Sequence, residues 1–484
     1  MKTDIAYIVS HGFAARMIIQ TNLLGLLVAD GKKKVALIAP DEEDDNLRTY
    51  CEKHGVDLYE FNPASNFWTS QYMEARKYFL EDIRKNPALW EKHIYATRFT
   101  KGRNPWRHIR PRLLMFFHNL RKWWPGLKDL YKRREEKQLE SPEAAQLLEK
   151  IDPSVFISTY PVNLSEAMML KAANEQGIKT VIHLLSWDNI SCKGHFPALA
   201  DEYIAWGPIM ERELMEYYQI PKEKIHAQGV PHFDLHVRSR QAPNPAPYLK
   251  ELGLDPSRPY LFFGMSSPRF APKEIDIVEW LAKSVKEDVF GKDIQLIIRP
   301  HPQNVQGSMA DQSWLPRLKA LHSGRVRVDF PDLVKSKMPW SIRQKDMERL
   351  SQLLVGASIS YNSGSTLSID ALMCGVPVVL TSFDGDAELS YWASARRLID
   401  YTHLKKLIAI GGVSVVSSYE ELTAVSQKYL EQPSFNMANR QKTIEEQCTG
   451  NEDFKTPVIA ETIRAINNTT NERNNQGSYV QPVN

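Results

Sequence analysis

Long apolar runs are absent from this 484-residue sequence. The best candidate, residues 18–29, is interrupted by three consecutive polar residues, whereas a membrane-spanning helix needs about 20 predominantly apolar residues. A secretory signal is also absent, because Asp4 precedes a short apolar stretch that is typical of a first β-strand. We therefore expect a cytoplasmic protein that does not span a membrane.

Cysteine and net charge are both low. The four cysteines (Cys51, Cys192, Cys374 and Cys448) lie far apart, with no pair at the spacing of metal ligands and too few for a disulfide framework. The formal net charge is only +3, from 61 Lys and Arg against 58 Asp and Glu, which argues against a general binder of nucleic acid. We expect a protein of a reducing compartment with no metal and no specific nucleic-acid partner.

The sequence does contain a regular alternation of strand and helix patterns. Strands are predicted at 5–9, 34–38, 56–61, 155–158, 180–185, 202–206 and 224–228, and again at 260–264, 294–298, 326–330, 357–361 and 376–380. Five prolines between residues 238 and 259 indicate a linker. We predict an α/β protein of two Rossmann-like doubly wound domains, residues 1–240 and 258–466, followed by a polar mobile tail at 467–484.

Residues 98–134 interrupt the first domain with a different composition. They contain 12 Lys or Arg, one acid and seven aromatic residues, which gives a local charge of +11. Apolar side chains recur there at helical spacing, at Leu113, Phe116, Phe117, Leu120 and Trp124. The pattern is typical of a basic amphipathic helix at an anionic membrane surface, which predicts a peripheral protein at the inner face of the membrane. The alternatives are an acceptor groove and an ordinary core helix.

Polar loops follow three strands of the second domain. The candidate nucleotide-binding residues in them are Ser266, Ser267, Arg269, Arg299, His301, Asn362, Ser363, Gly364, Ser365, Thr366 and Asp370. Because ligands bind beyond the carboxyl ends of parallel strands, the hydroxyls, cations and helix N–H groups predict a diphosphate site. Asp370 lies one helical turn further on, where its carboxylate could accept hydrogen bonds from ribose. The alternative for each loop is a turn whose side chains only cap backbone groups.

The first domain offers candidates for proton transfer. The strand at 180–185 runs into Trp187, Asp188 and Asn189, with Lys193 close behind. Asp188 could take the proton of an acceptor hydroxyl, and Trp187 could stack on a sugar ring, with Asn189 and Lys193 as further acceptor contacts. His11 is the competing base, because histidine titrates near neutral pH. A capping carboxylate and a structural histidine are the alternatives.

At these residues the chain resembles the GT-B glycosyltransferases, in which two Rossmann-like domains face a cleft and the C-terminal domain holds the nucleotide. The stretches 299–302 and 365–370 are similar to bacterial surface-polysaccharide transferases and to CDP-glycerol glycerophosphotransferases. The resemblance implies that His301, Ser365 and Asp370 bind the nucleotide diphosphate and ribose. The stretch 186–189 is similar to segments of sugar transferases in this group, which favours a sugar donor over an alditol phosphate.

The predicted function is transfer of a sugar from a nucleotide-diphosphate donor to a surface-glycan or lipid-linked acceptor, without metal or cofactor. Arg299 and a helix N-terminus would stabilise the leaving diphosphate, and the Asp384-Gly385-Asp386 triplet is interpreted as a solvated loop. The alternatives are a non-hydrolysing UDP-sugar 2-epimerase and a CDP-glycerol-type phosphotransferase. A non-enzymatic alternative is a basic protein that binds membrane or nucleic acid.

Overall fold

Two units make up the chain. The computed structural model describes residues 2–29, 31–64, 66–99, 106–305, 310–343, 345–449 and 454–477. Unit 1 comprises residues 1–232, 334–341 and 454–484, and unit 2 comprises residues 233–333 and 342–453. Each unit is built around one parallel β-sheet, as predicted. Among the described residues, no helix is both long enough and apolar enough to cross a membrane.

The sheet of unit 1 has seven strands in the order β3-β2-β1-β4-β5-β6-β7. They are β1 (Thr3–Ile8), β2 (Val35–Ala39), β3 (Asp57–Glu60), β4 (Pro153–Ser158), β5 (Lys179–His183), β6 (Glu202–Ala205) and β7 (Ile225–Ala227). β2 is buried along its whole length, as expected for an uninterrupted apolar strand that is covered on both faces. The strand order changes direction between β1 and β4, so their carboxyl ends mark the place where such sheets bind ligands.

Eight helices outside the insertion described below belong to unit 1 among the described residues. They are α1 (Gly12–Ile19), α2 (Leu23–Val28), α3 (Asp45–His54), α8 (Pro142–Ile151), α9 (Leu164–Glu175), α10 (Asn189–Cys192), α11 (Pro208–Tyr218) and α22 (Lys455–Gly477). The single helix expected from residue 14 to 30 is divided into α1 and α2. Asn22 separates them with left-handed backbone (φ 61°), and its Oδ1 accepts a hydrogen bond from the Tyr50 hydroxyl at 3.2 Å.

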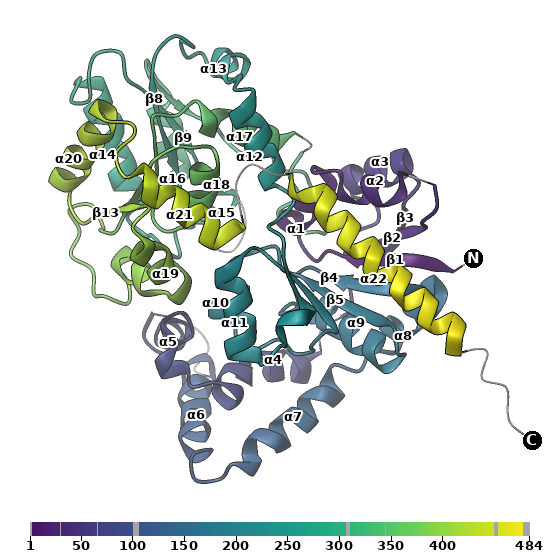
Figure 1. Ribbon diagram of the computed structural model, residues 1–484. Helices are drawn as coiled ribbons and strands as arrows, with labels where there is room; N and C mark the ends of the chain where they lie inside the picture. Colours follow the sequence, from purple (N-terminus) through teal and green to yellow (C-terminus); the bar gives the residue numbers. More distant parts are fainter. Residues whose placement is uncertain are drawn as a thin grey trace, which may run out of the picture. The chain divides into compact units, whose positions relative to one another are not determined.

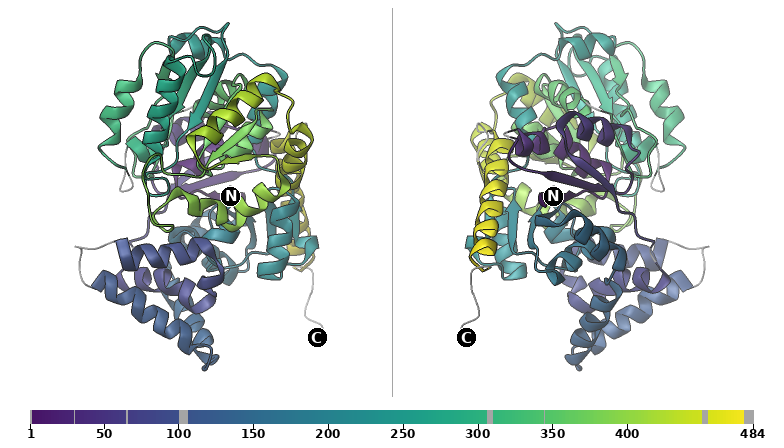
Figure 2. Two further views of the ribbon diagram at one scale, coloured as in Figure 1. Left: turned by 90° about the vertical axis from the view of Figure 1, so that its left-hand side faces the viewer. Right: turned by 90° about the vertical axis from the view of Figure 1, so that its right-hand side faces the viewer.

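A helical insertion lies between β3 and α8 of unit 1. It comprises α4 (Phe67–Leu80), α5 (Pro87–Ile94), α6 (Trp106–Leu120) and α7 (Gly126–Gln138), which Figure 2 shows grouped together. The insertion has its own small core, in which the rings of Phe79 and Tyr131 stack at 4.6 Å. Two bonds join α6 to the end of α4: His118 Nδ1 lies 2.9 Å from the Tyr78 carbonyl oxygen, and Arg121 donates to the Phe79 carbonyl at 2.6 Å.

The sheet of unit 2 has six strands in the order β10-β9-β8-β11-β12-β13. They are β8 (Tyr260–Gly264), β9 (Gln295–Arg299), β10 (Val326–Val328), β11 (Ile359–Asn362), β12 (Val378–Thr381) and β13 (Ser414–Val416). The edge strand β13 was not predicted. The strand order changes direction between β8 and β11, which makes their carboxyl ends the counterpart of those of β1 and β4.

The helices of unit 2 follow the strands in the expected alternation. They are α12 (Phe233–Gln241), α13 (Ala246–Glu251), α14 (Glu274–Lys286), α15 (Pro302–Val305), α16 (Trp314–Leu321), α17 (Asp346–Val355), α18 (Leu367–Met373), α19 (Thr402–Ile410), α20 (Tyr419–Glu431) and α21 (Met437–Cys448). A continuous core of aliphatic and aromatic residues from β8, β9, β11 and α14 fills the space between sheet and helices.

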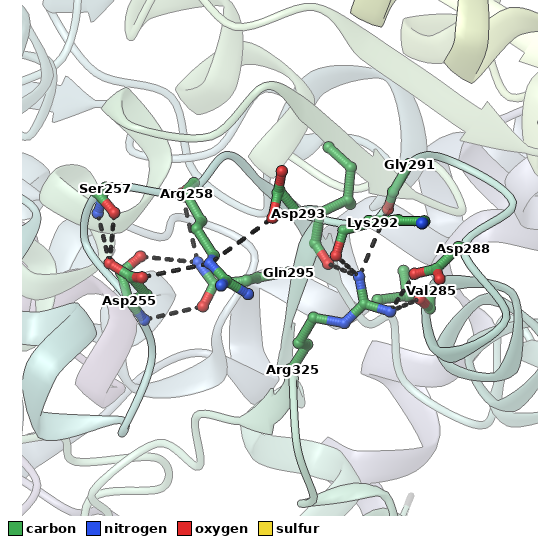
Figure 3. A network of polar contacts seen from close by, with 11 residues as sticks. Asp255, Ser257, Arg258, Val285, Asp288, Gly291, Lys292, Asp293, Gln295 and Arg325 are labelled. Atoms are coloured by element: carbon green, nitrogen blue, oxygen red, sulfur yellow. Dashed lines mark hydrogen bonds and ion pairs between the residues drawn. The ribbon is translucent and has the colours of Figure 1, made fainter.

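A polar network closes the amino end of β9 in unit 2 (Figure 3). The Gln295 side chain accepts from the Asp255 N–H at 2.9 Å and donates to the Asp255 carbonyl at 2.8 Å. Arg325 donates to the Val285 carbonyl at 2.7 Å and to Asp288 Oδ1 at 2.5 Å. The polar groups named above are thus hydrogen-bonded to one another at the amino edge of the sheet. The candidate site lies at the opposite, carboxyl edge.

The boundaries of the units differ from the predicted domains. α12, which we placed in the first domain, belongs to unit 2 and packs on α17 and α18. α22, which we placed mainly in the second domain, belongs to unit 1 and runs beside α2 and β4 (Figure 1). Residues 334–341 also belong to unit 1, where the Gly12 N–H donates to the Pro339 carbonyl at 2.8 Å. Proline-rich composition indicates a linker, but it does not show on which unit the flanking helices pack.

The predicted mobile tail begins too early. α22 continues to Gly477, and Asn467 is fully buried in it. Asn467 Nδ2 donates to the Asp4 carbonyl at 3.0 Å, and its Oδ1 accepts from Lys33 Nζ at 2.5 Å. These partners lie more than 400 residues away in the sequence. The Asn-rich composition of the segment therefore did not indicate a packed helix. Residues 478–484 of the predicted tail lie outside the described residues.

Candidate functional site

Three predicted loops meet at the carboxyl edge of the unit 2 sheet. Asn304, behind β9, donates from Nδ2 to the Ser266 carbonyl behind β8 at 2.8 Å. The Glu274 carboxylate accepts the Ser266 N–H at 2.6 Å and also hydrogen bonds with Ser363 behind β11. Burial raises the pKa of Glu274 to about 7, although the bonds from Ser363 and Ser266 act in the opposite direction. One buried carboxylate therefore connects the loops on both sides of the switch point.

The eleven predicted nucleotide-binding residues differ in exposure. Half-buried ones are Arg269, His301, Gly364, Ser365, Thr366 and Asp370, and buried ones are Ser266, Ser267, Arg299, Asn362 and Ser363. Only the first group is accessible to a ligand in the structure as it stands. The first group therefore forms the candidate contact surface, which we call the unit 2 edge, and the second group shapes the loops beneath it.

Arg299 is paired with protein carboxylates. Its guanidinium forms ion pairs with Asp329 and Asp346, and all three side chains are buried. Asp329 also accepts a hydrogen bond from Arg349 Nε at 2.9 Å. Burial opposes the charge of Arg299, but the two carboxylates outweigh it and raise the pKa of the guanidinium. The network fixes the end of β9, so we assign Arg299 a supporting role in place of direct contact with a diphosphate.

The turn after β11 is organised by Asn362. Its Oδ1 accepts the N–H groups of Gly364 and Ser365, each at 2.8 Å, and the hydroxyl of Ser368 at 3.1 Å. Gly364 has φ 98°, and a Cβ added there would lie 2.7 Å from Leu404 Cδ1. Two N–H groups that we expected to face an anion are thus bonded to Asn362. The hydroxyls of Ser365 and Thr366 remain half-exposed.

Asp370 on α18 is paired with a histidine that no sequence pattern indicates. Its Oδ1 lies 3.0 Å from His236 Nε2, and His236 Nδ1 lies 3.0 Å from Ser351 Oγ. Burial opposes protonation of His236, but Cys374 and Asp370 raise its pKa to about 10. The Asp370 carboxylate thus faces a protonated ring, and its oxygens can accept hydrogen bonds from the hydroxyls of ribose.

The Asp384-Gly385-Asp386 triplet is only partly a solvated loop. Asp384 is buried, and its Oδ1 accepts the Ala395 N–H at 3.0 Å, whereas Asp386 is exposed. Gly385 between them has φ 61°. The interpretation as a solvated loop was therefore wrong for Asp384, whose carboxylate caps a backbone group within the unit.

His11 lies at the switch point of unit 1, directly behind β1. Its Nδ1 accepts the Ala14 N–H at 3.0 Å and so caps α1, and its ring lies 5.0 Å from that of Tyr160. Burial lowers the pKa of His11 to about 4, and the cations of Lys193 and Arg16 act in the same direction. The ring is therefore neutral near pH 7. With Nδ1 accepting, the proton resides on Nε2, which makes His11 a hydrogen-bond donor in this arrangement.

Asp188 lies behind β5 at the same edge of unit 1. Its Oδ1 accepts the Ser186 hydroxyl at 2.6 Å, and its Oδ2 lies 2.8 Å from Lys193 Nζ. Burial opposes the charge of Lys193, but Asp188 and Tyr160 outweigh it and raise the pKa of the ammonium group. Lys193 influences both His11 and Asp188, so the two competing bases belong to one cluster. His11 uses Nδ1 to cap α1, whereas the Asp188 carboxylate contacts Ser186 and Lys193.

The remaining acceptor candidates lie deeper than expected. Trp187 is 5% exposed and Asn189 is 1% exposed, so neither presents a free face to a sugar. The Asn189 amide finds no hydrogen-bond partner within the described part of the chain, which leaves it able to bind a ligand or water. Lys193 is half-buried and lines a cavity. Among the three predicted acceptor contacts, Lys193 is thus the accessible one.

The basic aromatic segment combines a packed face with an exposed one. Phe117 stacks on Phe79 at 6.2 Å and belongs to the core of the insertion, so the core interpretation holds for that residue. Other apolar side chains lie in solvent, with exposed fractions from 43% at Leu113 to 88% at Trp123; we call them the exposed stripe: Trp106, Ile109, Leu113, Phe116, Trp123 and Trp124. Residues 100–105 of the segment lie outside the described residues.

Three buried residues that support the unit 2 edge were not predicted. Glu274 occupies the first turn of α14, where an acidic residue ordinarily satisfies helix N–H groups, and nothing in the sequence connects it with Ser266. Asn304 follows His301 by three residues, which is a usable signal for a loop cap. His236 precedes Asp370 by 134 residues, so only the folded chain brings them together.

The fold is similar to the folds of several solved proteins. No family model matches the sequence, and no curated protein matches it as a relative. A Listeria monocytogenes protein assigned as a UDP-N-acetylglucosamine 2-epimerase is similar over 100% of this chain and 99% of its own, at 11% identity and TM-score 0.55. The Neisseria meningitidis UDP-GlcNAc 2-epimerase bound to UDP-GlcNAc is similar over 96% and 100%, at 11% identity and TM-score 0.54.

A glycosyltransferase from Rickettsia africae is similar over 96% of this chain and 98% of its own, at 10% identity and TM-score 0.49. At such identities the likeness concerns the fold. The two parallel sheets, of seven and six strands, agree with it. The chain has a GT-B-like fold of two Rossmann-like units.

Proposed function

We propose that the protein is a glycosyltransferase that uses a nucleotide-diphosphate sugar. Unit 2 binds the donor, and unit 1 binds the acceptor and supplies the base. The proposal rests on one observation: the two sheets share a strand order, but the residues at their carboxyl edges differ in chemistry. The unit 2 edge presents hydroxyls, Arg269 and the ionised Asp370, whereas the unit 1 edge presents the Asp188–Lys193 pair.

Donor binding follows from the chemistry of the unit 2 edge. The hydroxyls of Ser365 and Thr366 donate to phosphate oxygens, the guanidinium of Arg269 supplies positive charge, and Asp370 accepts from ribose hydroxyls. The Neisseria meningitidis structure contains UDP-GlcNAc, so a uridine diphosphate sugar is the first donor to test. The experiment therefore varies both the nucleoside base and the sugar of the donor.

The transfer step needs a base and charge stabilisation. The proton of the acceptor hydroxyl passes to the Asp188 carboxylate as its oxygen bonds to the anomeric carbon. The bond between that carbon and the donor phosphate oxygen breaks, and the nucleoside diphosphate leaves with the electron pair. Arg269 and His301 at the unit 2 edge then stabilise the negative charge that develops. Lys193 keeps Asp188 ionised before transfer.

Calorimetry and product analysis test this proposal. UDP, CDP, GDP and dTDP are titrated into the full chain, followed by incubation of the matching nucleotide sugars with candidate glycan and lipid-linked acceptors. We expect one nucleoside diphosphate to bind well above the others, and acceptor-dependent release of that nucleotide. Absence of binding by all four would contradict the assignment of the unit 2 edge.

An epimerase is the second candidate, because the two solved structures of highest TM-score given above are UDP-N-acetylglucosamine 2-epimerases. Epimerisation removes and returns the proton at C2 and needs no acceptor. Incubation of UDP-GlcNAc in deuterium oxide without acceptor distinguishes the two. Deuterium at C2 of the recovered sugar nucleotide supports the epimerase, whereas unlabelled substrate together with acceptor-dependent transfer supports the glycosyltransferase.

The acceptor side of the proposal includes an anionic membrane surface. The exposed stripe on and behind α6 gives large apolar side chains to solvent, and Lys122 and Lys128 beside it are exposed. Apolar side chains at the headgroup level, flanked by lysines, bind anionic bilayers. A lipid-linked acceptor would be presented to unit 1 at such a surface.

Vesicle binding tests the membrane proposal. We expect co-sedimentation with phosphatidylglycerol vesicles to exceed that with phosphatidylcholine, and to weaken with salt, since charges are screened over about 8 Å at physiological ionic strength. Phe116→Ser with Trp123→Ser and Lys122→Glu with Lys128→Glu should each reduce it. Met437→Ser, at an exposed apolar position of unit 2, is the matched control. Equal binding to both lipids would contradict the proposal.

A further inference from the structure

A cavity in unit 1 has four cationic side chains and one carboxylate in its lining. It has a volume of about 150 Å³ and is bounded by α4, α5, Val162 behind β4 and residues 193–197 behind β5. Its cationic lining residues are Arg76, Lys77, Lys92 and Lys193. Because residues behind β4 and β5 contribute to it, the cavity lies at the edge of the sheet where ligands of such folds bind.

Two of the four cations are paired with acids of unit 1. Arg76 forms an ion pair with Glu135 of α7, and both side chains are buried. Lys193 Nζ lies 2.8 Å from Asp188 Oδ2. The lining carboxylate of Glu74 is itself paired with Arg110. These groups are therefore balanced without a ligand.

Lys77 and Lys92 have no carboxylate within ion-pair distance in the part of the chain that the structure describes. Lys92 Nζ donates to the Cys192 carbonyl at 3.0 Å, and Lys77 Nζ lies 5.4 Å from the centroid of the Tyr78 ring. Burial is the main cause that lowers the pKa of both amines to about 8. Lys193 and Lys77 contribute to the lowered pKa of Lys92, whereas Asp188 favours the charge of Lys92 and Glu91 favours that of Lys77. Partly buried cations that form no ion pair lose hydration without full compensation, so an anion that entered the cavity would be bound favourably.

We propose that this cavity binds a phosphoryl or diphosphoryl group of the acceptor, with Lys77 and Lys92 as its ligands. Two ammonium groups balance the two negative charges of a phosphate monoester and most of the charge of a diphosphate, whereas a ligand with one carboxylate would neutralise only one of them. Lysine binds phosphate as a point charge and does not require the planar geometry of arginine. That the bound group belongs to an acceptor rests on the proposed function. That the cavity binds a phosphoryl group does not depend on it.

Inorganic pyrophosphate, titrated into the full chain in the presence of saturating UDP, tests the site. UDP occupies the unit 2 edge, so calorimetry reports the remaining site. We expect Lys77→Met with Lys92→Met to weaken pyrophosphate binding at least tenfold, and Lys137→Met, at an exposed position of α7, to leave it unchanged. Equal affinity in the double variant and the parent would overturn the proposal.

A second measurement uses the unaltered protein, in case the double variant does not fold. Amines with a pKa of about 8 react with an acetylating ester at pH 8 faster than ordinary surface lysines. We expect mass spectrometry to show fast acetylation of Lys77 and Lys92 and protection of both by pyrophosphate. Acetylation that pyrophosphate does not slow would overturn the assignment.

Two further ligands distinguish the source of the phosphoryl group. Geranyl diphosphate represents a lipid-linked acceptor, and glucose 1-phosphate represents a free sugar phosphate; competition by either supports the site and identifies the source. Equal competition by acetate at the same ionic strength would overturn it, because that result indicates general screening. Loss of UDP binding with pyrophosphate binding retained would contradict the proposed donor site alone, so the two proposals fail separately.

Discussion

Units 1 and 2 share one topology, yet their carboxyl edges carry different chemistry. In each unit a buried glutamate holds a loop at the switch point: Glu166 accepts the N–H groups of Thr159 and Tyr160 at 2.7 and 2.6 Å, and Glu274 accepts the Ser266 N–H at 2.6 Å. Near this glutamate, the edge of unit 1 carries the ionisable groups His11, Asp188 and Lys193. The edge of unit 2 carries the hydroxyls of Ser365 and Thr366 and the carboxylate of Asp370. Under the proposed function, this difference allows unit 1 to take the acceptor proton and unit 2 to bind the donor.

The largest expected effect concerns the base in unit 1. Asp188→Asn removes the proton acceptor but keeps the size of the side chain, so turnover should fall by about 10²–10⁴-fold, the usual contribution of general acid–base catalysis. Nucleotide affinity should stay within a factor of about three. His11→Ala should lower turnover less, because His11 Nδ1 already caps α1. The opposite ranking in steady-state kinetics would exchange the two roles.

The next effect separates support from binding within unit 2. Arg299→Met removes a cation from the buried carboxylates of Asp329 and Asp346, although Asp329 keeps Arg349, so the free energy of unfolding should fall by about 3–5 kcal/mol. Urea unfolding measures this loss. The folded fraction should still bind UDP with nearly unchanged affinity. If Arg299→Met, or the milder Arg299→Lys, abolishes UDP binding in folded protein, Arg299 contacts the diphosphate after all.

A smaller effect is expected at the contact surface itself. Asp370→Ala removes the ribose acceptor and leaves the charged His236 beside the site, and His301→Ala removes a half-buried ring at the same edge. Each should weaken UDP binding by about 10–100-fold, which corresponds to the loss of one charged hydrogen bond. Asp386→Ala, an exposed carboxylate of the same unit, is the control. Calorimetric affinities that are equal in all three would remove the site from this edge.

The smallest effect concerns pH and the two buried glutamates. Glu274 keeps its proton in the folded protein up to about pH 7 but loses it near pH 4.5 in the unfolded chain. Unfolding therefore releases a proton in this window, and the free energy of unfolding falls as pH rises from 5 to 7. Glu274→Gln should remove about 1–3 kcal/mol of that fall. Burial also raises the pKa of Glu166, so Glu166→Gln should act with the same sign. An unchanged pH slope in both variants would contradict this account.

The sequence predicted the two parallel sheets well, because buried strands and amphipathic helices depend on local periodicity. β8 at 260–264 and α17 at 346–355 have the bounds expected. The three polar loops of unit 2 were also found, since residues behind parallel strands meet at one edge. What could not be predicted depends on distant contacts, such as the pairing of Asp370 with His236 and the packing of α22 on unit 1.

The roles of individual groups were harder to predict than their positions. Arg299 was found at the end of β9, but its two acidic partners lie 30 and 47 residues further on, where no local pattern reveals them. The N–H groups of Gly364 and Ser365 were placed in the expected turn, yet the Asn362 side chain occupies them. No sequence pattern indicated Lys77 and Lys92. Their partial burial, and the lack of a carboxylate within ion-pair distance among the described residues, are properties of the folded insertion.

The central claim is that unit 2 binds the donor while unit 1 performs proton transfer. The most direct test measures UDP affinity and turnover in parallel for Asp188→Asn and Asp370→Ala. The account predicts a crossed result: Asp188→Asn loses turnover and keeps UDP affinity, whereas Asp370→Ala loses UDP affinity. Loss of UDP affinity in Asp188→Asn, with normal affinity in Asp370→Ala, would contradict it.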